Sequence, residues 1–96
     1  MRLFPKAVRV RVGHALGRVQ NGLEPPNWKP MPSIGVGVRE IRVTSGGQFR
    51  VLYKSKHGEA IYVLHAFEKK TRKTSEADLS LARQRLGLVR TSLGGQ

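Results

Sequence analysis

The sequence IYVLHAFEKKTRKT, residues 61–74, decides how the rest of the chain can be arranged. It begins with an apolar, β-prone run that is typical of a strand. It ends in a cluster of cations, Lys69, Lys70, Arg72 and Lys73. Because one strand would deliver His65 and Phe67 to the same end as these cations, the stretch predicts a sheet edge that contacts phosphates and bases.

Two further strands are predicted before this stretch. Residues 38–44, VREIRVT, alternate in polarity and are followed by a turn at residues 45–47, SGG, and then by QFRVLYKS at residues 48–55. A second turn at residues 56–59 leads into AIYVLHAF at residues 60–67. Short turns between successive strands predict an antiparallel meander. The last strand is apolar on both faces up to Leu64, so we interpret it as central and covered.

Alternation assigns the side chains of the middle strand to two faces. One face carries Arg50, Leu52 and Lys54, and the other carries Phe49, Val51 and Tyr53.

Residues 4–21 fit two patterns. Val8, Val10 and Val12 alternate with arginines as in a strand, whereas Val8, Val12, Ala15 or Leu16, and Val19 follow the spacing of a helix. The length of the second pattern favours a helix that ends at Gly22. Residues 22–37 hold four of the five prolines and are predicted to lack regular structure. Within them, Trp28 is expected to pack on the core rather than to stack on a base.

A second helix is predicted after the cation cluster. Ser75 and Asp78 have the spacing of a capping box, with Thr74 as an alternative cap. The apolar stripe of this helix is Leu79, Ala82, Leu86 and Val89, while Arg83, Arg85 and Arg90 face elsewhere. The expected fold class is therefore α+β: an N-terminal helix, a meander sheet of three or more antiparallel strands, and a C-terminal helix. We expect one domain over residues 1–96, with residues 1–3 and 91–96 frayed.

Charge is the strongest compositional signal. The 96 residues include 18 Lys and Arg against six Asp and Glu, for a formal net charge of +12. Such a balance is typical of chains that bind a polyanion. The sequence has no cysteine and no apolar run of the roughly 20 residues that span a bilayer. These features predict a soluble cytoplasmic protein that binds nucleic acid or a ribonucleoprotein and has no membrane partner.

The motifs of metal and nucleotide sites are missing from the sequence. His14, His57 and His65 lie far apart, and no carboxylate stands at ligand spacing from them. The chain has neither a P-loop nor a dinucleotide-binding fingerprint. We therefore expect no metal and no cofactor. Glu40 is an acid within a predicted strand and is expected to pair with a neighbouring arginine.

What remains is a basic and aromatic set that suits cleavage of a phosphodiester. Such a site needs a group that takes the proton of a ribose 2′-OH, cations that stabilise the phosphorane, and an acid for the leaving oxygen. His65 is the candidate acid or base, with Lys54 as the alternative base, and Arg50 and Lys69 are candidate phosphate-stabilising cations. Phe67 or Tyr53 would stack a base. The candidate phosphate-binding residues are Arg39, Arg42, Lys70, Arg72 and Lys73.

The segments FPKAVRVRVGHAL, GVREIRV, FRVLY and VLHAFEKKTRKT, followed by LARQRL, resemble the phage-derived Gp49-like branch of the HigB/RelE toxin superfamily. The resemblance covers residues 3–88. It implies a RelE-like fold and a toxin of a type II toxin–antitoxin module. It also implies ribosome-dependent cleavage of mRNA in the ribosomal A site by 2′-OH attack.

The same resemblance implies the partners. They are a helix-turn-helix antitoxin similar to HigA, which neutralises the toxin, and operator DNA that is reached only through that antitoxin. A homodimer or a heterotetramer with the antitoxin is possible for such modules.

The resemblance also matches individual residues to the site. Arg50 matches the strand arginine that contacts the scissile phosphate, and Arg39 and Arg42 are expected on the same concave surface. His65, Phe67, Lys69 and Lys70 match the basic and aromatic end of the last strand.

Two departures from the relatives are present. The strand that usually precedes the first helix is absent or reduced, so a sheet edge is expected to be exposed or filled by the antitoxin or a second copy. Glu68 stands where relatives commonly have Gln. Two other readings stay open: a non-catalytic RNA- or ribosome-binding protein, and a gyrase poison similar to ParE.

Overall fold

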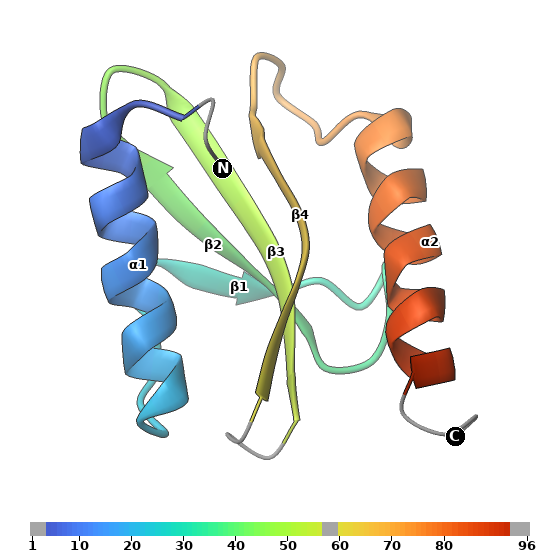
Figure 1. The fold of residues 1–96 in the computed structure, drawn as a ribbon. Coiled ribbons are helices and arrows are strands. Elements are labelled where there is room, and N and C mark those ends of the chain that lie inside the picture. Colours follow the sequence, from blue (N-terminus) through green and yellow to red (C-terminus); the bar gives the residue numbers. More distant parts are fainter. Residues whose placement is uncertain (1–3, 57–59, 93–96) are drawn as a thin grey trace.

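The computed structural model describes residues 4–56 and 60–92 of the chain. These residues form an antiparallel sheet with one helix on each face (Figure 1). Along the chain, the elements are α1 (Lys6–Gln20), β1 (Trp28–Pro30), β2 (Val38–Thr44), β3 (Gln48–Lys56), β4 (Ala60–Glu68) and α2 (Glu76–Ser92). The sheet order is β1-β2-β3-β4. The predicted α+β architecture is confirmed.

Residues 4–21 form a helix because their apolar side chains fit one helical face. The buried residues of α1 are Val8, Val12, Ala15 and Val19, as the helical spacing predicted. Val10, which a strand would have placed on the same face as Val8 and Val12, is 62% exposed. Gly22 follows the helix with φ of +77°, a conformation that glycine adopts without strain.

β3 is an inner strand, and its apolar residues are divided between two cores. The α1-side core contains Ile41, Val43, Phe49, Val51 and Tyr53 beside the buried residues of α1. The α2-side core contains Met31, Ile34, Val38, Leu52, Leu64, Phe67, Ala82 and Leu86. Phe49, Val51 and Tyr53 therefore share one face and Leu52 lies on the other, as the alternation predicted.

The interpretation of the last strand as central was wrong. β4 pairs only with β3 among the described strands and lies at the edge of the sheet. Its Val63 side chain is 45% exposed. The fourth strand of the sheet, β1, pairs with β2 and not with β4. The inner strands are therefore β2 and β3, and β4 is left at the edge despite its apolar residues.

Residues 22–37 contain more regular structure than their prolines suggested. Trp28–Pro30 pair antiparallel with residues 39–41 of β2, after a turn in which Asn27 has φ of +51°. Pro30 is tolerated there because it lies on an edge strand, where an N–H is not required on the outer side.

Trp28 belongs to neither core. The Arg39 guanidinium lies 4.1 Å from the centroid of its ring, and its Nε1–H donates to the Glu24 carboxylate at 2.7 Å. The expectation that Trp28 anchors the core is thus wrong.

The start of α2 matches the predicted capping box. Asp78 N–H donates to Ser75 Oγ at 3.1 Å, and the Ser75 hydroxyl donates to Asp78 Oδ2 at 2.7 Å. The helix continues to Ser92, two residues beyond the point where fraying was expected. The expectations for residues 1–3 and 93–96, and for most of the turn at residues 56–59, lie outside the described residues. No helix of the described chain is long and apolar enough to cross a membrane.

Candidate nucleic-acid interface

A buried carboxylate, Glu40, holds a group of cations on the α2-facing side of the sheet. The Glu40 side chain is 1% exposed, and its Oε1 lies 3.1 Å from Arg42 Nε, 3.8 Å from Arg50 Nε and 4.0 Å from Lys29 Nζ. These residues come from β1, β2 and β3, and strand pairing brings them together: Lys29 is opposite Glu40, and Arg42 is opposite Arg50. Glu40 with Lys29, Arg42, Arg50 and Lys69 is called the cation cluster below.

Arg50 is the most deeply placed cation of the cluster. Its side chain is 9% exposed, and its Nη1 donates to the Phe49 carbonyl at 3.0 Å. Burial lowers the pKa of Arg50, Glu40 opposes that effect and Arg42 adds to it. An arginine remains charged under such a shift. Among the described residues, no hydrogen-bond partner reaches Arg50 Nε or Glu40 Oε2. Unpaired buried polar atoms are uncommon, and an anion-binding site is one setting that retains them.

Lys69 extends the cluster from the end of β4. Its backbone N–H donates to the Gln48 carbonyl at 2.7 Å, which ties it to the start of β3. Partial burial lowers the pKa of Lys69, and the charges of Arg50, Lys29 and Arg42 lower it further, although Glu40 opposes them. Three cations therefore lie within 4.0 Å of one carboxylate, and the charge of Lys69 adds to the same group. Their mutual repulsion favours binding of an anion such as a phosphate.

A β-bulge turns His65 toward α2. Leu52 pairs with His65 while Tyr53 pairs with Val63, so Leu64 is an extra residue in β4. This extra residue allows Leu64 to enter the α2-side core while its neighbour His65 also reaches α2. Bulges commonly redirect side chains in this way beside functional sites.

Both ring nitrogens of His65 face side chains of α2. Its Nε2 lies 2.7 Å from Asp78 Oδ1, and its Nδ1 lies 3.5 Å from Arg85 Nη1. Arg85 Nη1 also donates to the Leu64 carbonyl at 3.0 Å. Burial raises the pKa of Asp78, but hydrogen bonds from Ser75 and His65 and the charge of His65 outweigh it, so its pKa lies below the usual 3.8.

Phe67 connects His65 to the cation cluster. It pairs with Arg50 across β3 and β4, and its ring stacks on the His65 ring with centroids 5.0 Å apart and planes 20° apart. Its side chain belongs to the α2-side core and is only 9% exposed. Little of the ring is therefore free to meet a base. The cluster, Phe67 and His65 form one continuous strip on the face that α2 covers.

Three predicted site residues lie elsewhere. Arg39 points to the opposite face of the sheet and covers Trp28. It is three residues from Arg42, and successive residues of a strand face opposite ways, so an odd separation places the two on opposite faces. The expectation of a surface shared by Arg39 and Arg42 is wrong. Lys54 Nζ donates to the Val36 carbonyl at 2.7 Å, and it lies four residues, about 13 Å, along β3 from Arg50.

Tyr53 is fully buried in the α1-side core, with 0% exposure. Burial raises the pKa of its hydroxyl. Its ring packs inside the molecule, which corrects the expectation that it stacks on a base.

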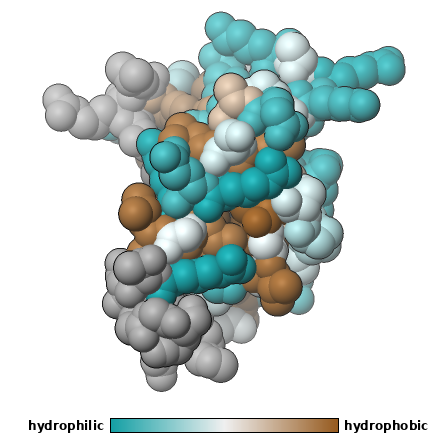
Figure 2. All heavy atoms as spheres, turned by 90° about the vertical axis from the view of Figure 1, so that its right-hand side faces the viewer, coloured by the Kyte–Doolittle hydropathy of each residue, from teal (hydrophilic) through white to brown (hydrophobic). Residues whose placement is uncertain are grey.

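The remaining predicted cations lie on the loop between β4 and α2. Lys70, Arg72 and Lys73 are all exposed there. Viewed from the α2 side, the molecule shows hydrophilic side chains crossing a surface that also exposes hydrophobic atoms (Figure 2). The loop between β4 and α2 adds charge next to the strip, because its cations follow Lys69 directly in the chain.

Sequence reasoning missed Lys29 of the strip and two residues of α2 that contact its His65, Asp78 and Arg85. Lys29 was hidden in the proline-rich segment, because nothing in its composition predicted that Trp28–Pro30 would pair with β2. Asp78 carried a signal as a capping residue, but the contact with His65 depends on how α2 packs against β4. Arg85 was assigned away from the sheet because it lies outside the apolar stripe of α2. Its side chain is long enough to reach past that stripe to the Leu64 carbonyl.

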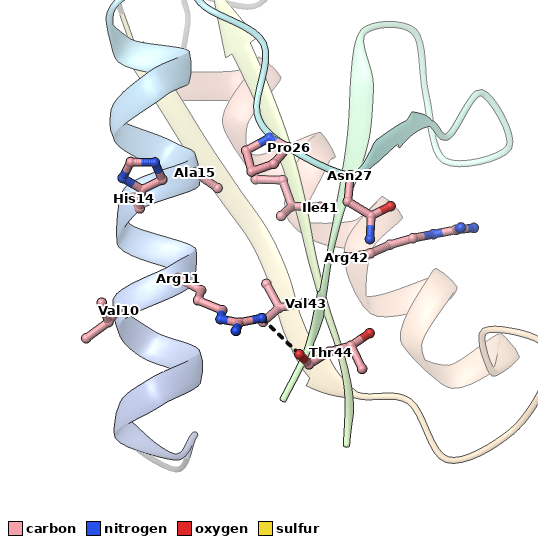
Figure 3. A pocket seen from close by; sticks show the side chains of 10 residues that line it. All are labelled: Val10, Arg11, His14, Ala15, Pro26, Asn27, Ile41, Arg42, Val43 and Thr44. Atoms are coloured by element: carbon pink, nitrogen blue, oxygen red, sulfur yellow. Dashed lines mark hydrogen bonds between the residues drawn. The ribbon is translucent and has the colours of Figure 1, made fainter. Parts of the chain in front are cut away.

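A separate groove of about 510 Å³ lies on the other side of the sheet, between α1 and the end of β2. Figure 3 shows Arg11 crossing it to donate to the Thr44 carbonyl, at 3.0 Å, while Arg42 points away from α1. The groove is lined mainly by apolar atoms and His14, and it contains none of the strip residues except Arg42.

Fold and site together define a small, basic α+β domain with a cation-rich surface on one face of its sheet. A sequence model described as phage derived protein Gp49-like (DUF891) matches residues 1–87. The chain therefore belongs to the Gp49-like family, a RelE-like toxin group. No curated protein and no solved structure matched it in the corresponding comparisons.

Proposed function

We propose that this protein is the toxin of a type II toxin–antitoxin module and that it cleaves mRNA on the ribosome. The observation that carries the proposal is the strip on the α2-facing side of the sheet, where four cations around one buried carboxylate continue through Phe67 to His65. Membership of the Gp49-like family supports the same reading.

The reaction would be an attack of a ribose 2′-oxygen on the adjacent phosphorus. The P–O5′ bond breaks, which leaves a 2′,3′-cyclic phosphate and a 5′-hydroxyl. His65 would accept the 2′-OH proton, and a protonated group or water would supply the proton of the 5′-hydroxyl. Arg50 and Lys69 would stabilise the charge that develops on the phosphorane oxygens, and Arg42 and Lys29 would hold the neighbouring phosphate.

The loop cations would bind RNA outside the reacting phosphate. Lys70, Arg72 and Lys73 are exposed and free of the cluster's carboxylate, which suits contacts with successive phosphates of mRNA or with ribosomal RNA. The neutralising partner would be a helix-turn-helix antitoxin, through which the complex contacts operator DNA.

A second function, non-catalytic RNA or ribosome binding, is favoured by one observation. Both ring nitrogens of His65 already face side chains of α2, and its side chain is 13% exposed. These contacts also suit a purely structural role, in which His65 joins β4 to α2. In that case the cation cluster binds RNA without cutting it.

The experiment compares wild type with Lys69→Ala and Arg50→Ala in a translating extract and with the same mRNA free of ribosomes. We expect new 5′-hydroxyl ends in primer extension only with ribosomes, and a loss of at least about 100-fold in each variant. Arg9→Ala, an exposed cation of α1, is the matched control and should cut as wild type does.

Circular dichroism on each variant separates loss of cleavage from loss of folding, since Arg50 is buried and Lys69 is half-buried. Ribosome binding without new ends would support the non-catalytic alternative. DNA damage signalling without mRNA cleavage would support a gyrase poison.

A further inference from the structure

Asp78 and Arg85 are two residues of α2 that meet the candidate proton-transferring histidine. Asp78 Oδ1 lies 2.7 Å from His65 Nε2, and its other oxygen accepts from Ser75 at 2.7 Å. The carboxylate is therefore held at both oxygens, one by the helix cap and one by the imidazole. Its side chain is 29% exposed, so the contact is partly shielded from water.

The chemistry of the neighbours fixes which nitrogen of His65 carries the proton. A carboxylate only accepts hydrogen bonds, so Nε2 must donate to Asp78. A guanidinium only donates, so Nδ1 faces Arg85 with its lone pair. Arg85 Nη1 is 3.5 Å from Nδ1, which is long for a hydrogen bond, and it is held more firmly by the Leu64 carbonyl at 3.0 Å. Nδ1 therefore has a lone pair that no strong bond occupies.

We propose that Asp78 is a positioning residue that holds His65 in the Nε2–H tautomer, so that Nδ1, beside the Arg85 guanidinium, is the atom that takes the 2′-OH proton. The proposal rests on the proposed ribonuclease function. In the step, Nδ1 accepts the proton and the imidazolium that forms is stabilised by the Asp78 carboxylate through Nε2–H. Arg85 then lies where it can bind a non-bridging oxygen of the reacting phosphate.

The placement of this pair follows from two local features. The bulge at Leu64 brings His65 to the side of α2, and the capping box places Asp78 in the first turn of the helix. The stack of Phe67 against the imidazole restricts its rotation. A ring that is oriented by a carboxylate and packed on one face is preorganised for proton transfer.

The test compares wild type, Asp78→Asn and Glu76→Gln with two measurements, the ¹⁵N shifts of the His65 ring and the rate of ribosome-dependent cleavage. Glu76→Gln is the matched control, because it removes an acid from the same helical turn. Glu76 pairs with Arg83 and not with His65. A His65→Gln spectrum assigns the ring signals among the three histidines.

We expect wild type and Glu76→Gln to show a protonated Nε2 and an unprotonated Nδ1, with equal cleavage rates. In Asp78→Asn, the amide can donate to Nε2 and favour the opposite tautomer. We expect the Nδ1–H form to become populated and cleavage to fall about 100-fold, while Asp78→Glu recovers part of the rate.

Unchanged ring shifts in Asp78→Asn would overturn the proposal, and so would a changed tautomer with an unchanged cleavage rate. If the wild type makes no cuts, the proposed ribonuclease function and the proton-transfer role built on it both fail. The ring shifts still show in that case whether Asp78 fixes the tautomer, so the two failures are told apart.

Discussion

Glu40 is the residue that balances the charges of the candidate site. It is 1% exposed, and the nearest cations reach it from three strands. The side chains of Arg42 and Lys29 are 36% and 45% exposed. Removing its charge would leave Arg50 buried among like charges. A buried pair that loses one partner is destabilised by about 3–5 kcal/mol, and the exposure of Lys29 and Arg42 lowers that figure here.

For Glu40→Gln we therefore expect the free energy of unfolding to fall by about 2 kcal/mol. Phosphate should recover more of this loss than chloride at equal ionic strength, because an anion bound among the cations replaces the missing charge. Thermal unfolding in the two salts measures both effects. Glu76→Gln, which breaks an exposed pair, should change stability by less than about 0.5 kcal/mol. Equal gains in the two salts would contradict an anion site in the cluster.

The limits of sequence reasoning are clearest at single residues. Alternation placed Phe49, Val51 and Tyr53 on one face correctly, because a strand has a fixed period of two. The same rule, applied to residues 38–44, separates Arg39 from Arg42, so that error came from grouping residues by charge instead of by face. The contact of His65 with Asp78 was beyond this reasoning, because it depends on a bulge and on the packing of α2.

At the scale of elements, α2, the loop before it and β1 each add residues to the candidate site. The capping box predicted where α2 begins, and its apolar stripe predicted the face that packs on β4. The pairing of β1 was not predictable, because a strand of three residues that includes a proline has almost no periodic signal. That short strand is what adds Lys29 to the cluster.

The loop between β4 and α2 should set the salt dependence of RNA binding. Each phosphate contact that is lost changes the slope of log affinity against log salt by about 0.7 for a single strand. Lys70→Ala with Lys73→Ala should therefore reduce the slope by about 1.4. Titration of a single-stranded RNA at several KCl concentrations measures it. Lys6→Ala with Arg9→Ala removes the same charge from exposed positions of α1 and should leave the slope close to that of wild type. Equal changes in both double variants would mean that net charge, and not this loop, governs binding.

At the scale of the whole molecule, two apolar layers share one sheet. β3 contributes Phe49, Val51 and Tyr53 to the α1-side core and Leu52 to the α2-side core. Most helical stability in proteins comes from tertiary packing, and both helices contain glycine and β-branched residues that weaken a helix, so each depends on the sheet for its stability. The candidate site lies on the α2 side, yet β2 and β3, which contribute to it, also pack against α1 on the other side. Damage to the α1-side core should therefore reach the site through the sheet.

This coupling predicts a single unfolding transition for both layers. Val12→Ala on the α1 side and Leu86→Ala on the α2 side each remove apolar volume at positions that are at most 1% exposed. Each should lower the free energy of unfolding by about 2–4 kcal/mol. Urea unfolding followed by helical circular dichroism and by fluorescence of Trp28, the one tryptophan of the sequence, should give coincident curves for both variants. Val10→Ala is the control for α1, because Val10 is 62% exposed and should change stability by less than about 0.5 kcal/mol. If Leu86→Ala separated the two curves, α2 would unfold independently of the sheet, and the contact of Asp78 with His65 would then form and break without unfolding the α1 layer.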